Sequence, residues 1–217
     1  MLLKIYQRLH ESFGSQHWWP AKTPFEVIIG AILTQQTSWN NVEKAINNLK
    51  KEKLLDSKKL HEIKNEKLEK LIQSSGYYRQ KTKKLKNFMN LLWENYDGIL
   101  EKLFEQPIPK LRENLLSVNG IGKETADSII LYAANKPVFV IDAYTVRLMN
   151  RLGITQEKDY DKLQKLFQKN LPQDVQLFNE FHALIVKLGK DYCKKKPRCN
   201  KCPLKQNCNY AKKSLKS

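Results

Sequence analysis

The pattern of apolar and polar positions along this chain is dominated by helical spacing. Four stretches carry apolar residues three or four positions apart, as in helices with one buried face, and they are 25–33, 85–93, 126–134 and 177–188. Thr23 followed by Pro24 is a typical start for the first of them, because threonine caps a helix and proline fits its first position. The apolar run 138–141 is a short candidate strand. We therefore expect an all-α fold.

Two further segments of the chain are strongly polar. The interval 50–70 is rich in charge, with apolar residues on one side, which predicts a solvated helical face. The chain beyond Tyr210 ends in the lysine-rich segment 212–217, and we expect this end to be frayed.

Size and charge narrow the class of protein. The 217 residues are 41% hydrophobic, enough for one sizeable domain or two small lobes that share a core. There is neither a run of about 18 apolar residues nor a signal-peptide pattern, so we expect a cytoplasmic protein without membrane contact. The formal net charge of +17 favours a nucleic-acid partner, because basic side chains that neutralise phosphates release counterions. The alternative is a lysine-rich surface that only faces solvent, as in thermophilic proteins.

Segment 115–126 predicts a tight hairpin between two helices. Gly120 and Gly122 turn the chain, since glycine accepts positive φ and lets a partner approach the backbone. The N–H groups that open the second helix can hold an anion such as a DNA phosphate, with Lys123 and Thr125 beside them. An ordinary glycine-containing loop is the alternative.

The four cysteines of the chain lie close together in sequence near its C-terminal end. Clustered cysteines in a cytosolic chain are more often ligands of a metal or cluster than disulfide partners. Their order is Cys193, Cys199, Cys202 and Cys208.

The hairpin is followed by an apolar helix and the run Val-Ile-Asp-Ala-Tyr-Thr-Val-Arg at 140–147. This order resembles the helix-hairpin-helix DNA glycosylases of the endonuclease III superfamily, over nearly the whole chain. Segments 31–37 and 76–81 are similar to two further motifs of that family. The resemblance implies a two-lobed helix-hairpin-helix glycosylase fold with a cleft between the lobes. One lobe would be 24–137, with the hairpin at about 112–135, and the other 1–23 plus 138–217, with the cysteine loop 193–208.

The resemblance makes Asp142 the superfamily's catalytic aspartate. Breaking an N-glycosidic bond builds positive charge on the sugar, which a fixed carboxylate stabilises while it orients a water. Capping of the next helix is the alternative role, and both can hold. Bifunctional members carry a lysine where this chain has Glu124, and Lys123 points about 100° away around the helix. Since a carboxylate cannot form an imine, we expect a monofunctional enzyme that uses water. Glu124 either polarises the pocket or is a helix-start acid.

The family also implies parts that extract the base from the duplex. Gln36 matches the glutamine that fills the vacated space, with an exposed helix glutamine as the alternative. Trp18, Trp19 and Trp39 are candidates for stacking on the extruded base, although a tryptophan is more often core. This arrangement resembles the 3-methyladenine branch of the superfamily, whose cationic bases suit aromatic faces.

The cysteine spacing resembles the superfamily's loop for a 4Fe–4S cluster, with a first spacing one residue shorter than usual. Zinc is the competing occupant. The leading expectation is thus a monomeric glycosylase that removes alkylated purines such as 3-methyladenine from double-stranded DNA containing a damaged base. A glycosylase/lyase for oxidised pyrimidines and a noncatalytic cluster-bearing DNA-binding protein are the alternatives.

Overall fold

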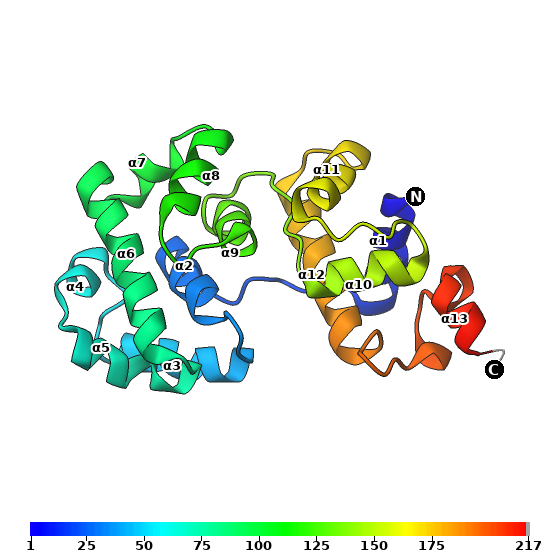
Figure 1. Ribbon diagram of the computed structural model, residues 1–217, viewed down its shortest axis with the longest axis horizontal. Helices are drawn as coiled ribbons and strands as arrows, with labels where there is room; N and C mark the ends of the chain where they lie inside the picture. Colours follow the sequence, from blue (N-terminus) through cyan, green and yellow to red (C-terminus); the bar gives the residue numbers. More distant parts are fainter. Residues whose placement is uncertain (216–217) are drawn as a thin grey trace. The chain divides into compact units, whose positions relative to one another are not determined.

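Helices supply all the regular structure of residues 1–215, which are the residues that the computed structural model describes. The chain divides into two units, with Met1–Pro20 and Pro137–Ser217 in unit 1 and Ala21–Lys136 in unit 2 (Figure 1). Unit 1 contains α1 (Leu2–Phe13), α10 (Ala143–Leu152), α11 (Tyr160–Asn170), α12 (Val175–Asp191) and α13 (Asn209–Ser214). Unit 2 contains α2 (Pro24–Leu33), α3 (Trp39–Lys51), α4 (Ser57–Glu62), α5 (Asn65–Ile72), α6 (Tyr78–Tyr96), α7 (Leu100–Phe104), α8 (Ile108–Ser117) and α9 (Lys123–Ser128). The prediction of an all-α fold is confirmed.

Unit 2 is built around α2, whose residues from Phe25 onward are all buried. The helix begins as its sequence predicts, because the Thr23 side chain accepts a hydrogen bond from the amide of Glu26 and Pro24 occupies the first helical position. Helices α3, α6 and α9 contact α2, and a π-helical turn at Ile129–Ala133 continues α9 (Figure 1). A helix that is buried on nearly every side requires such cover, and its one charged residue, Glu26, is paired with Lys50 at 2.6 Å.

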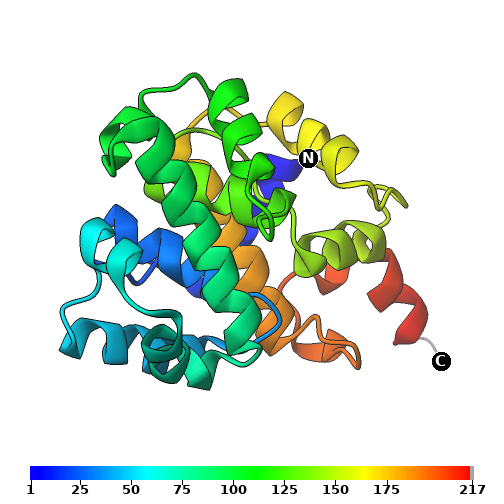
Figure 2. The ribbon, with the colours of Figure 1, turned by 60° about the vertical axis from the view of Figure 1, so that its left-hand side comes forward.

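Unit 1 is centred on α12, which contacts α1 and α10 (Figure 2). Its aromatic core brings Phe139 against α11 and α12: the ring of Phe139 stacks on that of Phe167 with centroids 4.1 Å apart, and meets those of Phe178 and Phe181 edge-on. This core fixes the chain that leads into α10, which is the segment on which Asp142 lies.

Two expectations about local structure are wrong, and a third is refined. The run 138–141 is buried but is not a strand, because glutamine side chains of α11 replace a partner strand: Gln168 Oε1 accepts from the Phe139 amide, and Gln164 Nε2 donates to the Phe139 carbonyl. The charged interval 50–70 contains two short helices, α4 and α5, with buried leucines between them and α6. The expected fraying beyond Tyr210 is wrong for the residues of α13, while 216–217 lie outside the described residues.

Across the described residues, no helix combines the length and the apolar character that crossing a bilayer requires.

Candidate active site and cysteine loop

The predicted hairpin lies in unit 2 and joins α8 to α9. Gly120 has φ 98°, and a Cβ added to it would lie 2.3 Å from Cγ of Lys84, so this position requires glycine. Gly122 differs, because its backbone is extended at φ −93° and an added Cβ would meet nothing within 4 Å. The second glycine therefore leaves the loop backbone open on its outer side, where a partner could approach.

Side chains from two other segments brace this hairpin. Gln35 Nε2 donates to the Gly120 carbonyl at 3.1 Å and to the Thr125 hydroxyl at 3.0 Å, while Gln35 Oε1 accepts from Lys84 Nζ. On α6, Asn87 Nδ2 donates to the Asn119 carbonyl at 3.1 Å. Thr125 is buried, so its hydroxyl serves this network inside the protein.

A buried ion pair joins the two helices of the hairpin. Arg112 of α8 donates from Nε and Nη2 to the two carboxylate oxygens of Asp127 in α9, at 2.7 and 3.1 Å. The Asp127 side chain is fully buried and the Arg112 side chain is 22% exposed. Two parallel bonds of this kind fix orientation as well as distance, so α9 is held in one rotational setting against α8.

The remaining predicted residues of unit 2 lie near helix starts. Lys123 and Glu124 are exposed on the first turn of α9, where an acid is favoured by the helix dipole. Gln36 is exposed with φ 55° in the turn after α2, and Trp39 is the half-buried first residue of α3.

Asp142, in unit 1, is the N-cap of α10. Its Oδ1 accepts hydrogen bonds from the amide of Thr145 at 2.7 Å and from the Thr145 hydroxyl at 2.9 Å. Burial would raise the pKa of Asp142, but contact with His182 and these two bonds outweigh burial and lower the pKa below its ordinary value. Asp142 therefore combines a helix cap with a carboxylate whose ionised form is favoured by its surroundings.

His182 is a part of this site that the sequence did not reveal. Its Nε2 lies 3.7 Å from Oδ2 of Asp142, and the two side chains are 8% and 11% exposed. The residue lies on the buried, apolar face of α12 beside Phe181 and Ala183, where a polar side chain is unusual. A histidine in an otherwise apolar stretch of the sequence indicates a buried polar contact, but it does not identify Asp142 as the partner.

The two N-terminal tryptophans are neighbours in unit 1. Trp18 and Trp19 are half-buried and meet edge-on, with ring centroids 5.7 Å apart and an interplanar angle of 66°. Lys190 Nζ of α12 lies 5.6 Å from the centroid of the Trp18 ring, which is a cation–π contact. Trp18 also lines a cavity of about 410 Å³ with Tyr6, Asp174 and Glu180, and Asp142 does not line that cavity.

The cysteine loop gathers four free thiols against the end of α10. The pKa of the Cys202 thiol is raised to about 11, mainly by burial and also by the other three cysteines. A hydrogen bond from the backbone amide of Leu204 acts in the opposite direction. Arg151 binds the loop at two thiols, donating to Cys193 Sγ at 3.3 Å and accepting at its carbonyl from Cys208 Sγ at 3.3 Å. Four free thiols gathered in one loop are a donor set that a cationic metal centre would stabilise as thiolates. No group of three or more His, Cys, Asp or Glu within residues 1–215 has the geometry of a metal-ion site.

Most of the chain is similar to known proteins. Residues 29–173 match the family described as HhH-GPD superfamily base excision DNA repair protein. A protein of Methanocaldococcus jannaschii that is described as a DNA repair glycosylase is 50% identical over 96% of each chain. Endonuclease III of Thermotoga maritima is 31% identical over 97% of this chain and 93% of its own.

Two solved structures are similar as well. The 3-methyladenine DNA glycosylase MagIII of H. pylori, bound to 1,N6-ethenoadenine, is 30% identical with a TM-score of 0.75, over 87% of this chain and 97% of its own. A non-covalent endonuclease III–DNA complex is 25% identical with a TM-score of 0.84, over 100% of this chain and 99% of that chain.

Proposed function

The chain belongs to the HhH-GPD superfamily of base excision DNA repair proteins, and we propose that it is a monofunctional DNA N-glycosylase that hydrolytically removes an alkylated purine such as 3-methyladenine. The observation that carries this proposal is the environment of Asp142. A carboxylate that is buried yet held ionised is suited to stabilise the positive charge that develops on the sugar as the base departs.

The two carboxylate oxygens of Asp142 have different neighbours, Thr145 at Oδ1 and His182 at Oδ2. Thr145 engages Oδ1 twice, whereas Oδ2 faces His182 at 3.7 Å, beyond a normal hydrogen bond. We assign Oδ2 to the reacting sugar and its attacking water, and Oδ1 to fixing the carboxylate in place. His182 is then a positioning residue.

The proposal of water as nucleophile rests on position 124. Bifunctional members of this superfamily carry a lysine there, and its amine forms an imine with the sugar. Glu124 cannot form that bond, and the neighbouring Lys123 lies about 100° around the helix axis. Borohydride reduction during turnover on damaged DNA should give no covalent protein–DNA adduct, with a bifunctional endonuclease III trapped in parallel as the positive control. Efficient trapping of this protein would refute the monofunctional assignment.

The proposal of an alkylated purine rests on the tryptophan pair. Lys190 Nζ lies 5.6 Å from the centroid of the Trp18 ring, and this cation–π contact supports a role for the indole in binding an alkylated purine, which is a flat cation. We include Trp39 and the plug residue Gln36 in the proposed base-extrusion machinery by their motif positions, with Gly120, Gly122, Lys123 and the brace residue Thr125 in the phosphate-binding hairpin.

A second candidate function is supported by the similarity to endonuclease III, namely a glycosylase/lyase acting on oxidised pyrimidines. One assay separates the candidates: base release from duplexes that carry 3-methyladenine, 7-methylguanine, thymine glycol, uracil or 8-oxoguanine. We expect release of the alkylated purines without strand cleavage. Release of thymine glycol with cleavage would establish the second candidate, and no release from any duplex would favour a noncatalytic DNA-binding protein.

We further propose that Cys193, Cys199, Cys202 and Cys208 hold a 4Fe–4S cluster. Such a cluster would supply an iron-centred positive charge that stabilises the four thiolates and fixes the fold of the loop. The purified protein should be brown, with broad visible absorbance and iron and sulfide in equal amounts. Cys202→Ser should lose the colour, whereas a colourless wild-type protein containing zinc would refute the cluster.

A further inference from the structure

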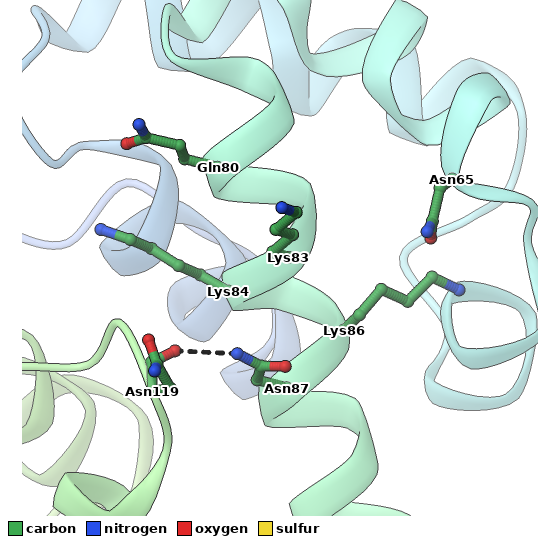
Figure 3. Close-up of a pocket in the computed structure, with 7 residues that line it drawn as sticks. All are labelled: Asn65, Gln80, Lys83, Lys84, Lys86, Asn87 and Asn119. Atoms are coloured by element: carbon green, nitrogen blue, oxygen red, sulfur yellow. Dashed lines mark hydrogen bonds between the residues drawn. The ribbon is translucent and has the colours of Figure 1, made fainter.

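A polar groove along α6 in unit 2 has no part in the chemistry described so far. We call it the α6 groove, and its volume is about 500 Å³. It is lined by Asn65, Gln80, Lys83, Lys84, Lys86, Asn87 and Asn119. Three of these carry positive charge, four carry amides and none is acidic or apolar. Figure 3 shows three lysines along α6, with Asn119 of the hairpin loop on one side and Asn65 on the other.

The three lysines of the α6 groove are not equivalent. Lys86 Nζ donates to the carbonyls of Leu60, His61 and Ile63 at the end of α4, so its charge stabilises that helix end. Lys84 Nζ is bound to Gln35.

Lys83 differs from both, because it is exposed and has no hydrogen bond or ion pair within residues 1–215. Its ammonium group is therefore available to a partner from solution.

The lining chemistry identifies the kind of partner. Pockets for small molecules are lined mainly by apolar and aromatic side chains, and the α6 groove has none. Lysines and amide N–H groups instead match the oxygens of phosphates and sugars, which receive most protein hydrogen bonds in DNA complexes. A volume of about 500 Å³ equals the share of roughly 15 water molecules, more than a single small anion requires.

The α6 groove is also continuous with the hairpin. Asn119 lines the groove and directly precedes Gly120, and its carbonyl accepts the hydrogen bond from Asn87. The stem of Lys84 lies against Gly120 from the same side. The groove therefore begins at the residue that precedes the hairpin's first glycine, so a strand bound at the hairpin would lie next to it.

We propose that the α6 groove binds the DNA sugar–phosphate backbone beyond the phosphate held by the hairpin, with Lys83 as its ionic contact. This inference rests on the proposed function, since it assumes that DNA is the partner. The groove extends the contact along the strand and adds affinity that does not depend on sequence.

The test measures affinity for a duplex that contains a tetrahydrofuran abasic-site analogue, from which no base can be released, over a series of salt concentrations. Neutralising one phosphate contact lowers the slope of log K against log salt by about 1, so Lys83→Gln should show that loss with a several-fold weaker affinity. Lys83→Arg should keep the wild-type slope because it keeps the charge.

Lys58→Gln is the matched control, since Lys58 is an exposed helical lysine of unit 2 that does not line the groove. Its slope should equal that of the wild type. Equal losses for Lys83→Gln and Lys58→Gln would show that net charge alone matters, and an unchanged slope for Lys83→Gln would remove the contact; either result overturns the proposal. A failure of the proposed function is distinct, because it appears as absent base release while the binding measurement remains valid.

Discussion

Replacing Asp142 can separate its role as a helix cap from its role in base release. Both hydrogen bonds of the cap, at 2.7 and 2.9 Å, end on Oδ1. Asp142→Asn keeps an oxygen at that position and asparagine is as good a cap, so the cap is retained and only the stabilisation of the ionised carboxylate, chiefly by His182, is lost. Asp142→Ala loses both bonds, which costs about 1–2 kcal/mol for an N-cap. At this chain length, each kcal/mol corresponds to a fall in Tm of about 2–4 °C.

Catalysis should respond differently, because both variants remove the negative charge. Loss of a preorganised group that stabilises a transition-state charge costs at least about a hundredfold in rate. Asp142→Asn should therefore fold and bind duplex DNA as the wild type does, and melt at a higher temperature than Asp142→Ala, while its single-turnover rate of base release falls at least about a hundredfold. The measurement needs thermal melting, duplex affinity and single-turnover rates on the same preparations. If Asp142→Asn released base within a few-fold of the wild-type rate, the assignment of Asp142 to the chemistry would be wrong.

Three further predictions concern the scaffold of unit 2. Burial and a neighbouring lysine lower the pKa of Lys81 to about 8. Between this pH and the unfolded value of about 10.4, the unfolded chain binds more protons than the folded one, so the contribution of Lys81 to the free energy of unfolding rises with pH. The free energies of unfolding of the wild type and of Lys81→Met, measured with denaturant, should therefore diverge over that pH range, and a constant difference would contradict the prediction. Arg112→Met leaves the Asp127 carboxylate buried without its main partner and should cost about 3 kcal/mol or more, whereas the double variant with Asp127→Leu should recover much of the loss. Gly120→Ala should destabilise the protein, because position 120 has φ 98° and an added Cβ would clash with Lys84. Gly122→Ala should leave the stability unchanged or higher but weaken duplex binding, because position 122 is extended and its outer side is open. Equal duplex binding by Gly122→Ala and the wild type would mean that no partner approaches that backbone.

The parts of the fold that the sequence predicts are those decided by neighbours along the chain. Thr23 caps α2 through the amide three residues later, and Gly120 turns the hairpin with φ 98°. The same expectation is wrong for Gly122, whose backbone is extended at φ −93°. The run 138–141 fails as a strand because the groups that satisfy its backbone are side chains of Gln164 and Gln168, more than twenty residues away. A period-based rule detects apolar spacing but not which distant amide completes a hydrogen bond.

In the candidate site, too, the sequence predicts contacts between residues close in the chain and misses those between distant ones. Asp142 was identified from the motif around it, and its cap bonds end three residues away at Thr145. His182, forty positions further on, is recognisable as part of the site only when α12 is packed beside α10. The direction of the Asp142 pKa shift could not be predicted either, because burial and His182 act in opposite directions and only the geometry decides between them.

The net charge illustrates why composition alone overstates a DNA-binding surface. At least two lysines of α6 serve the fold and not a DNA partner. Lys81 donates to the carbonyls of Leu33 and Ser75, and Lys86 donates to those at the end of α4. Both bind carbonyls within the protein, so neither releases counterions from a phosphate. Lys83 lies between them in sequence and has no such partner among the described residues. The salt slope should therefore count the lysines that project into solvent near the hairpin, and it should be much smaller than the formal charge suggests.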